Sequence, residues 1–370
     1  MSGSDLIDVV RAAIHDGDAV IRIRADLESA AGDKVLPPTY AGGKHNLTPP
    51  RADGSSEWCS LDSPASFANR VEAAINGAFP ELAPLRVQVG EKTLSTLQLP
   101  HRIFDATLRE STLDGTPWLE TAIAQAVQAA TPESAHPLLR WDPGLVLFGG
   151  WDSTKLGRRA KAVRQAKYPA ALSCEITASD VLPINRAGSR IDPLGIEGTE
   201  SSLVEHEDGR LEPYDAARQG ELPIRGEKDN DNYPRRVKPS QVNLGNVAPS
   251  LISKGVLVRG RIGLSGVLDL RRLGRYGFSP AADQEARVLL ALMGLFGVDA
   301  VLRQGLDLRR DCELIATTAS ISLVAFGGTA TDLDLTGVEA ALRAQIDSLR
   351  PHLAPATYLQ GNAALTSLVA

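Results

Sequence analysis

The chain has 370 residues with 39 Lys and Arg against 45 Asp and Glu, and its net charge of -6 excludes a protein that coats nucleic acid with its whole surface. The three cysteines are too far apart to indicate a disulfide framework or a zinc knuckle. The acids in the opening MSGSDLIDVV and the short apolar stretch at 288–298 argue against a signal peptide and a membrane span. We therefore expect a cytoplasmic protein with no metal, no cofactor and no membrane partner.

The first predicted element is a strand over residues 19–29, where apolar and polar residues alternate. One face of this strand carries apolar side chains, and the other carries Arg22 and Arg24. A polar connection rich in Gly and Pro follows, at about 30–60. It contains PPTYAGGKHN, which lacks the glycine and the Ser or Thr of a Walker loop, so we expect no NTPase. Tyr40 and Lys44 in this loop are candidates for contact with nucleic acid.

Helices and strands alternate over the next 120 residues. A helix is expected from an N-cap at Ser63 to a stop at Pro80, and a second helical zone from about 101 to 130 is broken at Asp114-Gly115. GLVLFGGW at 144–151 has the composition of a buried strand. The basic stretch after it is expected to form a helix ending near Pro169, and 170–182 a further strand.

Residues 183–250 differ in kind, because they are rich in Pro, Gly and acids and show no sustained period. Within them, 197–231 holds 11 acids and 4 bases, so the remainder of the chain is close to neutral. Strands are expected at 251–270 and 314–326, and helices from Ser279-Pro280 to Gly297 and at about 335–349. These elements predict an α+β fold with helices on one face of a sheet, formed by 1–182 and 251–370, with 183–250 inserted.

The stretch 151–176 is the first candidate site. Six basic residues lie between Asp152 and Glu175 with no acid among them, and five of the six recur at every third position. On a helix such a row drifts slowly around the cylinder and could follow a phosphate backbone. The alternative is a solvated helix face, although such faces normally mix acids with bases. The six residues are Lys155, Arg158, Arg159, Lys161, Arg164 and Lys167.

A second basic cluster occupies 251–278, where Asp269 is the single acid. Arginine forks bind phosphate, and the nearby Tyr276 and Phe278 could offer surfaces for base stacking. The cluster could equally be charge on strand edges. Its members are Lys254, Arg259, Arg261, Arg271, Arg272 and Arg275.

His101 and Arg102 open LPHRIFDATLRES, near Asp105. His101 could serve as the general base of a ribonuclease, but a histidine at a helix start more often only touches phosphate. The six histidines show no metal-ligand spacing, so a metal hydrolase is not expected.

Six ordered motifs between 61 and 278 point to one family. They are LDSPASFANRVEAAI, LPHRIFDATLRESTLDGTPW, LFGGWDSTKLG with CEI, SRIDPLGI, NLGNVAPSL and LRRLGRYGF. In this order they resemble the Cas-seven-type backbone subunit of type I-G (formerly I-U) CRISPR effector complexes, in the RAMP superfamily. The resemblance covers roughly 21–278.

The resemblance implies a non-catalytic protein. Its fold would be a palm similar to an RNA-recognition motif (ferredoxin-like), with finger elaborations and with 183–250 as an inserted thumb. Copies of the chain would stack along a guide CRISPR RNA, beside other effector subunits, and present the guide for pairing with target DNA. Such a protein gains its binding energy from phosphate and ribose, because the guide sequence varies.

Three functions therefore remain open: this RNA-binding backbone subunit, an endoribonuclease with His101 as base, and a protein-only scaffold. For the first, the expected RNA-binding residues are Arg22, Arg24, Tyr40, Lys44, His101, Arg102, Lys155, Arg158, Arg159, Lys161, Arg164, Lys167, Arg259, Arg271, Arg272 and Arg275.

Overall fold

The computed structural model describes residues 3–17, 20–152, 166–196, 203–206, 208–214, 235–325 and 327–369. The chain divides into two compact units. The larger unit comprises Met1–Leu182 and Leu257–Ala370, and the smaller comprises Pro183–Val256. The larger unit holds one long antiparallel sheet, a small second sheet and most of the helices, so the predicted α+β class is confirmed.

The main sheet of the larger unit has the strand order β18-β19-β1-β17-β10-β16-β2, with β20 beside β19 and β3 beside β10. All of the central pairs, β19 with β1, β1 with β17, and β17 with β10, are antiparallel. The strands are β1 (Val20–Ser29), β2 (Lys34–Val35), β3 (Ser56–Asp62), β10 (Leu172–Pro183), β16 (Val256–Val258), β17 (Ile262–Asp269), β18 (Leu306–Arg309), β19 (Cys312–Val324) and β20 (Ala330–Asp332).

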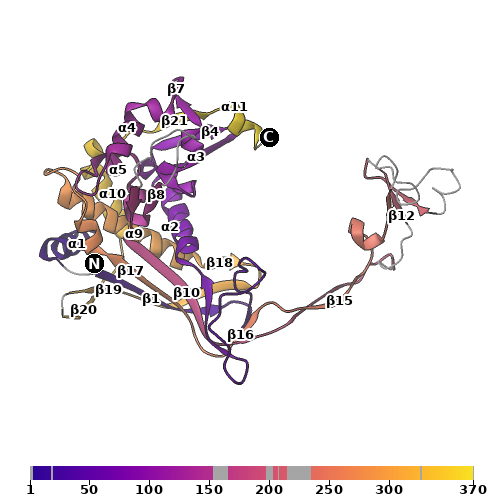
Figure 1. Cartoon of the computed structure of the whole chain (residues 1–370). Helices are drawn as coiled ribbons and strands as arrows, with labels where there is room; N and C mark the ends of the chain where they lie inside the picture. The colour runs from indigo at the N-terminus through magenta and orange to yellow at the C-terminus, as the bar shows by residue number, and fades with distance from the viewer. Residues whose placement is uncertain are drawn as a thin grey trace. The chain divides into compact units, whose positions relative to one another are not determined.

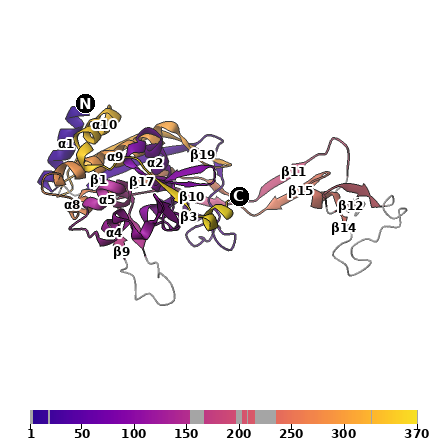
Figure 2. The ribbon, with the colours of Figure 1, turned by 90° about the horizontal axis from the view of Figure 1, so that it is seen from above.

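Two long helices, α2 (Pro64–Ala78) and α9 (Asp283–Gln304), connect the central strands, so the chain runs β1, α2, β10, β17, α9, β19. Both helices lie on the same side of the sheet (Figure 1, Figure 2). The sequence dictates this side, because Ile21, Ile23 and Leu27 of β1 are buried and alternate with polar residues. The helices α1 (Gly3–Asp16) and α10 (Val338–Ser348) pack against α9 and complete the layer.

A smaller five-stranded sheet, ordered β5-β4-β21-β6-β7, belongs to the same unit. Its strands are β4 (Leu85–Val89), β5 (Lys92–Ser95), β6 (Ser111–Leu113), β7 (Thr116–Pro117) and β21 (Thr357–Gly361). The short helices of the unit are α3 (Ala106–Arg109), α4 (Ala122–Ala129), α5 (His136–Trp141), α6 (Pro143–Phe148), α8 (Leu270–Gly274) and α11 (Ala363–Ser367). A separate hairpin pairs β8 (Gly150–Asp152) with β9 (Ala166–Tyr168).

The smaller unit contains a two-stranded ribbon and a three-stranded sheet. The ribbon pairs β11 (Arg186–Arg190) with β15 (Val247–Ile252), and the sheet is ordered β13 (Leu211–Pro213), β12 (Leu203–Glu205), β14 (Arg235–Val237). The guanidinium of Arg236 lies 3.8 Å from the ring centre of Tyr214, which packs on the buried Val204. A segment that shows no period in its sequence thus still forms strands, because short strands need only a few residues each.

The strand predicted over 19–29 and the helix predicted from Ser63 are confirmed, and Ser63 Oγ accepts a hydrogen bond from the Ser66 N–H at 3.3 Å. The prediction of a buried strand at 144–151 is wrong. Residues 143–148 form α6, which Asp142 caps by accepting the Leu145 N–H at 3.2 Å. The helix was hidden because all six of its residues are buried, and a helix buried on every side shows no 3.6-residue period.

Two further expectations need correction. The helix predicted to end near Pro169 does not extend over 166–168, which form β9, and the part of that prediction before Ala166 lies outside the described residues. The zone 101–130 is only partly helical, since β6 and β7 form a hairpin across Asp114 and Gly115. Both of these turn residues have positive φ, 48° and 81°, as a two-residue hairpin turn requires.

The close approach of α9 to α2 depends on Gly297. A Cβ added there would lie 2.4 Å from Cγ1 of Val71, a stiff β-branched side chain. We expect Gly297→Ala to lower the free energy of unfolding by about 1–3 kcal/mol through overpacking. Gly294 in the same helix is the control, because its added Cβ would meet nothing nearer than 3.4 Å. Urea denaturation should show Gly294→Ala to be neutral or stabilising by up to about 1 kcal/mol; equal stability of the two variants would contradict this packing.

Candidate nucleic-acid interface

The face of the main sheet opposite α2 and α9 carries arginines among small polar residues. Arg24 of β1 is exposed and lies between Ser320 of β19 and Ser265 of β17, both also exposed. Arg22 lies two residues earlier in β1, on the same face of the sheet, and is half-buried. Within the described part of the chain, neither guanidinium is paired with a carboxylate. The exposed serines on either side leave the side chain of Arg24 accessible to a ligand.

Hydroxyl groups donate hydrogen bonds to the acids Asp26, Glu175 and Asp332 of this face. Asp26 accepts a hydrogen bond from Oγ1 of Thr318 at 3.0 Å, and Glu175 of β10 accepts one from Oγ of Ser60 at 3.2 Å. Asp332 of β20 accepts one from Oγ of Ser322, the partner of Arg22, at 2.7 Å. On β1 itself, both arginines lie in the half of the strand that begins at Val20, and Asp26 and Glu28 lie in the other half.

The basic helix α8 starts at that same end of the sheet. Asp269, the last residue of β17, is paired with Val20, and it caps α8 by accepting the Arg271 N–H at 3.0 Å. Although burial opposes the shift, the hydrogen bond and charge of Arg271 hold the pKa of Asp269 below its usual value. Arg271 and Arg275 are exposed, and Arg272 donates a hydrogen bond to the carbonyl of Ala170.

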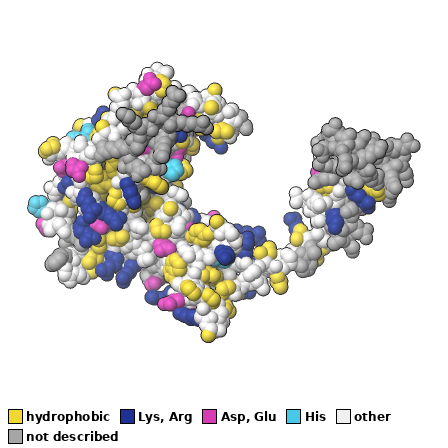
Figure 3. All heavy atoms as spheres, in the orientation of Figure 1, with side chains coloured by type: hydrophobic (Ala, Val, Ile, Leu, Met, Phe, Trp, Pro, Cys, Tyr) yellow, Lys and Arg dark blue, Asp and Glu magenta, His cyan; other side chains and the backbone are white. Residues whose placement is uncertain are grey.

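Residues 167–172 complete this end of the sheet. Lys167 of β9 is exposed, and Leu172, which starts β10, pairs with Leu268 of β17. Figure 3 shows Lys and Arg side chains gathered on the left of the larger unit's visible face. Segments from three distant parts of the sequence, β1, β9 and α8, thus bring basic side chains to one end of the main sheet. We call these residues the basic end: Arg22, Arg24, Lys167, Arg271, Arg272 and Arg275.

The predicted cluster at 251–278 is not one cluster in the structure. Arg259 lies before β17 and forms ion pairs with Asp180 at 2.9 Å and with Asp53 at 3.3 Å. The eight residues of β17 separate it from α8 by roughly 25 Å along the strand. Residues that come before and after one strand lie at opposite ends of the sheet, so Arg259 does not belong to the basic end.

The predicted loop residues also stand apart from the basic end. Tyr40 and Lys44 are exposed on a turn in which the Tyr40 N–H bonds to the Lys44 carbonyl at 2.9 Å. The chain after this turn runs along β3, which pairs with the middle of β10. Five other predicted residues, Lys155, Arg158, Arg159, Lys161 and Arg164, lie outside the described residues, in the segment that joins β8 to β9.

Arg102 has an internal role. Its Nε lies 2.6 Å from Oε1 of Glu72, and its Nη1 donates to the carbonyl of Gly149 at 2.9 Å. Burial raises the pKa of Glu72 to about 7 against the opposing charge of Arg102, and burial likewise raises that of Asp142 to about 6. The guanidinium is committed to these partners and anchors the residue that precedes β8, so Arg102 is not part of the basic end.

A groove of about 510 Å³ lies beside this anchor. His101, Phe148, Trp151, Lys167 and Tyr168 are among the residues that line it. His101 is exposed, and its backbone N–H donates to Oδ2 of Asp105 at 3.2 Å. Trp151 is 63% exposed and stands directly across the β8–β9 hairpin from Lys167.

The sequence reasoning missed Trp151 and chose other aromatic residues. Tyr276 and Phe278 are buried in a row of stacked rings with Tyr168, so their faces are not open to a base in this structure. The signal that could have found Trp151 is the GGW sequence, in which an aromatic residue follows two glycines immediately before a basic stretch.

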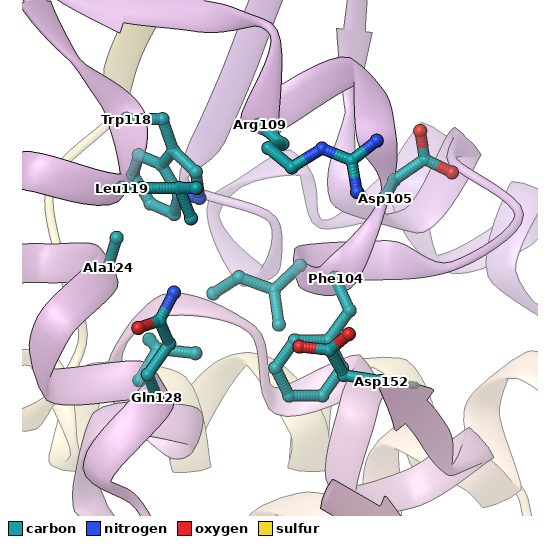
Figure 4. A pocket seen from close by; sticks show the side chains of 10 residues that line it. Phe104, Asp105, Arg109, Trp118, Leu119, Ala124, Gln128 and Asp152 are labelled. Atoms are coloured by element: carbon teal, nitrogen blue, oxygen red, sulfur yellow. The ribbon is translucent and has the colours of Figure 1, made fainter. Parts of the chain in front are cut away.

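A smaller cavity lies on the other side of β8, between Phe104, Trp118, Gln128 and Asp152 (Figure 4). Its volume is about 40 Å³, enough for water but far too small for a nucleotide. Within the described ranges, no group of three or more His, Cys, Asp or Glu is placed to hold a metal ion. No helix in those ranges is both long enough and apolar enough to cross a membrane.

Comparison with known proteins relates part of the chain to a CRISPR-associated family. Residues 21–183 match the family model described as CRISPR-associated protein GSU0053 (Cas_GSU0053). This segment contains β1, α2 and β10, and it amounts to somewhat less than half of the chain. The match agrees with the CRISPR-associated resemblance that the ordered motifs indicate.

Among solved structures, the chain is similar to Csc2 from Thermofilum pendens, with 8% sequence identity and a TM-score of 0.32. The alignment covers 90% of this chain and 77% of that one. A likeness at this level carries no argument about function. No curated protein matches the sequence.

Proposed function

We propose that this chain is a non-catalytic backbone subunit of a type I-G CRISPR effector complex, acting in the cytoplasm. It binds guide CRISPR RNA, polymerises along it and presents it for pairing with target DNA. The observation that carries the proposal is the basic end, where β1, β9 and α8 bring arginines and a lysine together in a protein that is acidic overall.

The strand order supports an RNA-recognition-motif-like palm. The chain order β1, α2, β10, β17, α9, β19 and the sheet order β19-β1-β17-β10 are those of a βαββαβ fold of the ferredoxin-like type. Folds of this type bind RNA on the sheet face that the helices leave open. Arg22 and Arg24 lie on that face here. In this proposal the smaller unit, Pro183–Val256, serves as the thumb.

A guide-binding subunit must hold RNA whatever its sequence, so its contacts must go to phosphate and ribose. Arginine and lysine side chains provide the phosphate contacts, and the serines beside Arg24 can hydrogen-bond to ribose hydroxyls. The five basic residues between β8 and β9, adjacent in sequence to the basic end, would extend the same surface.

Polymerisation needs a surface that joins one copy to the next. The acids concentrated in 197–231 give the thumb a charge opposite to that of the basic end, and this complementarity favours head-to-tail assembly of copies.

The decisive experiment incubates the purified chain with labelled precursor RNA and with a guide of different spacer sequence, each with and without divalent metal. We expect both RNAs to be bound with similar affinity, protected and uncut, and light scattering should show particles that grow with RNA length. Cleavage of the RNA would instead support the alternative function, an endoribonuclease. Loss of cleavage in His101→Ala would then identify His101 as its general base. Copies that assemble without binding RNA would indicate the protein-only scaffold.

A further inference from the structure

We infer that the groove beside Trp151 is a subsite for one nucleotide, in which the indole ring stacks on the base while Lys167 contacts the adjoining phosphate. This inference rests on the proposed RNA binding and specifies one contact within it. The contact with the base would be made in addition to the contacts that the other basic residues make with the sugar-phosphate backbone.

The first argument is the placement of Trp151. An indole ring that is 63% exposed loses the burial that usually stabilises it, so its exposure calls for a physical reason. Trp151 and Lys167 are directly opposed in the antiparallel β8–β9 pair, and opposed residues project from the same face of a hairpin. A flat ring and a cation are therefore held side by side at the groove, in the arrangement that a base and its phosphate require.

The second argument is the charge and size of the groove. Its ten lining residues include no carboxylate, and because the charge of Arg102 is balanced by Glu72, the exposed Lys167 is the cation that favours an anion here. Its volume of about 510 Å³ falls within the range of small-molecule sites. A nucleotide combines the aromatic plane and the negative charge that this lining complements. An acidic or purely aliphatic protein segment would match only one of the two.

The third argument is the pair of glycines before Trp151. A Cβ on Gly149 would lie 2.7 Å from both the Ala170 nitrogen and the Tyr168 carbonyl, and one on Gly150 would lie 2.0 Å from Cδ1 of Leu145. Both added atoms would collide with the protein itself, so the two glycines are required for the backbone to pack closely here, and this packing fixes the start of β8 from which Trp151 projects. The bond from Arg102 to the Gly149 carbonyl anchors this backbone next to Glu72.

The test measures the affinity of the full chain for a single-stranded RNA by fluorescence anisotropy. Trp151→Leu keeps the apolar volume and removes the aromatic face, and we expect it to weaken binding about tenfold, the effect of losing one stacked base. Trp151→Phe should restore most of the affinity. Lys167→Ala should reduce the slope of log affinity against log salt by about 0.7, whereas Trp151→Leu should leave that slope unchanged.

The control variant is Tyr358→Leu, which removes an aromatic ring that is 59% exposed but lies on β21, outside the groove. It should bind RNA like the wild type. An RNA with abasic sites should bind the wild type more weakly than intact RNA does. The Trp151→Leu variant should bind the two RNAs equally well, because its stacking ring is already missing.

The outcomes separate the subsite from the function on which it rests. If the wild type binds no RNA, the proposed function fails and the subsite with it. If the wild type binds with strong salt dependence but Trp151→Leu equals the wild type, only the subsite is overturned. If Trp151→Leu binds RNA normally yet no longer assembles several copies, the groove receives a protein side chain and the inference is wrong.

Discussion

Reversing two charges on the open face of the sheet, with Arg22→Glu and Arg24→Glu together, is expected to abolish RNA binding at physiological salt while leaving the fold intact. Each single-strand phosphate contact contributes about 0.7 to the salt slope, which corresponds to about fivefold in affinity between 1 M and 0.1 M salt. Losing two contacts therefore costs about 25-fold, and the new carboxylates add repulsion. Filter binding over a salt series measures both the affinity and the slope.

The matched control reverses two arginines on the helical layer, with Arg303→Glu and Arg350→Glu. Both are exposed, and each pairs with an acid on the surface, Asp299 and Asp347 respectively. Such pairs contribute little to stability, and the change in net charge equals that of the test variant. If the control loses as much affinity as the test variant, the net charge of the protein governs binding. A loss that depends on the guide sequence would contradict binding through the backbone.

The elements that follow a simple period could be predicted from the sequence. β1 alternates apolar and polar residues because one of its faces packs on helices. α2 could be predicted because Ser63 and Pro64 mark its start and Pro80 follows its end. α6 could not be predicted in this way, because a helix buried on every side presents the same apolar run as a buried strand. Residues 183–250 show no sustained period because β12, β13 and β14 have three residues each, and β11 (RAGSR) and β15 (VAPSLI) do not alternate apolar with polar residues.

From the sequence, the candidate site could be predicted only as a set of basic residues, without their arrangement in space. Basic residues can be counted along the chain, but β17 carries Arg259 and Arg271 to opposite ends of the sheet, and only the strand register shows this. Arg102 follows the exposed His101 and looks equally accessible in the sequence. Its role depends on Glu72, 30 residues earlier, and on Gly149, 47 residues later. Contacts at such separations leave no local trace in the sequence.

Arg102→Ala is expected to destabilise the fold by about 3–5 kcal/mol, because it leaves the Glu72 carboxylate buried without its partner. It also removes the hydrogen bond to the Gly149 carbonyl. Arg109→Ala is the control, since Arg109 pairs with the exposed Glu110 and should cost no more than about 1 kcal/mol. The double variant Glu72→Met with Arg102→Met should recover much of the loss, because an apolar pair needs no counter-charge. Urea denaturation that finds Arg102→Ala as stable as Arg109→Ala would show that the pair is not buried in solution.

The same buried carboxyl predicts how stability depends on pH. Burial raises the pKa of Glu72 to about 7 and that of Asp142 to about 6, so the folded chain retains protons that the unfolded chain releases above roughly pH 4. Stability from these groups is therefore fully present below that pH and is lost as the pH rises toward 7. Asp53, whose pKa is lowered to about 2 by hydrogen bonds from Ser55, acts in the opposite sense but only below about pH 4. Glu72→Gln keeps the shape of the side chain and cannot titrate, so its free energy of unfolding should fall less steeply between pH 5 and 7, in a window where Asp53 contributes nothing. An unchanged slope in Glu72→Gln would mean that Glu72 is already ionised throughout that window, held by Arg102 despite its burial.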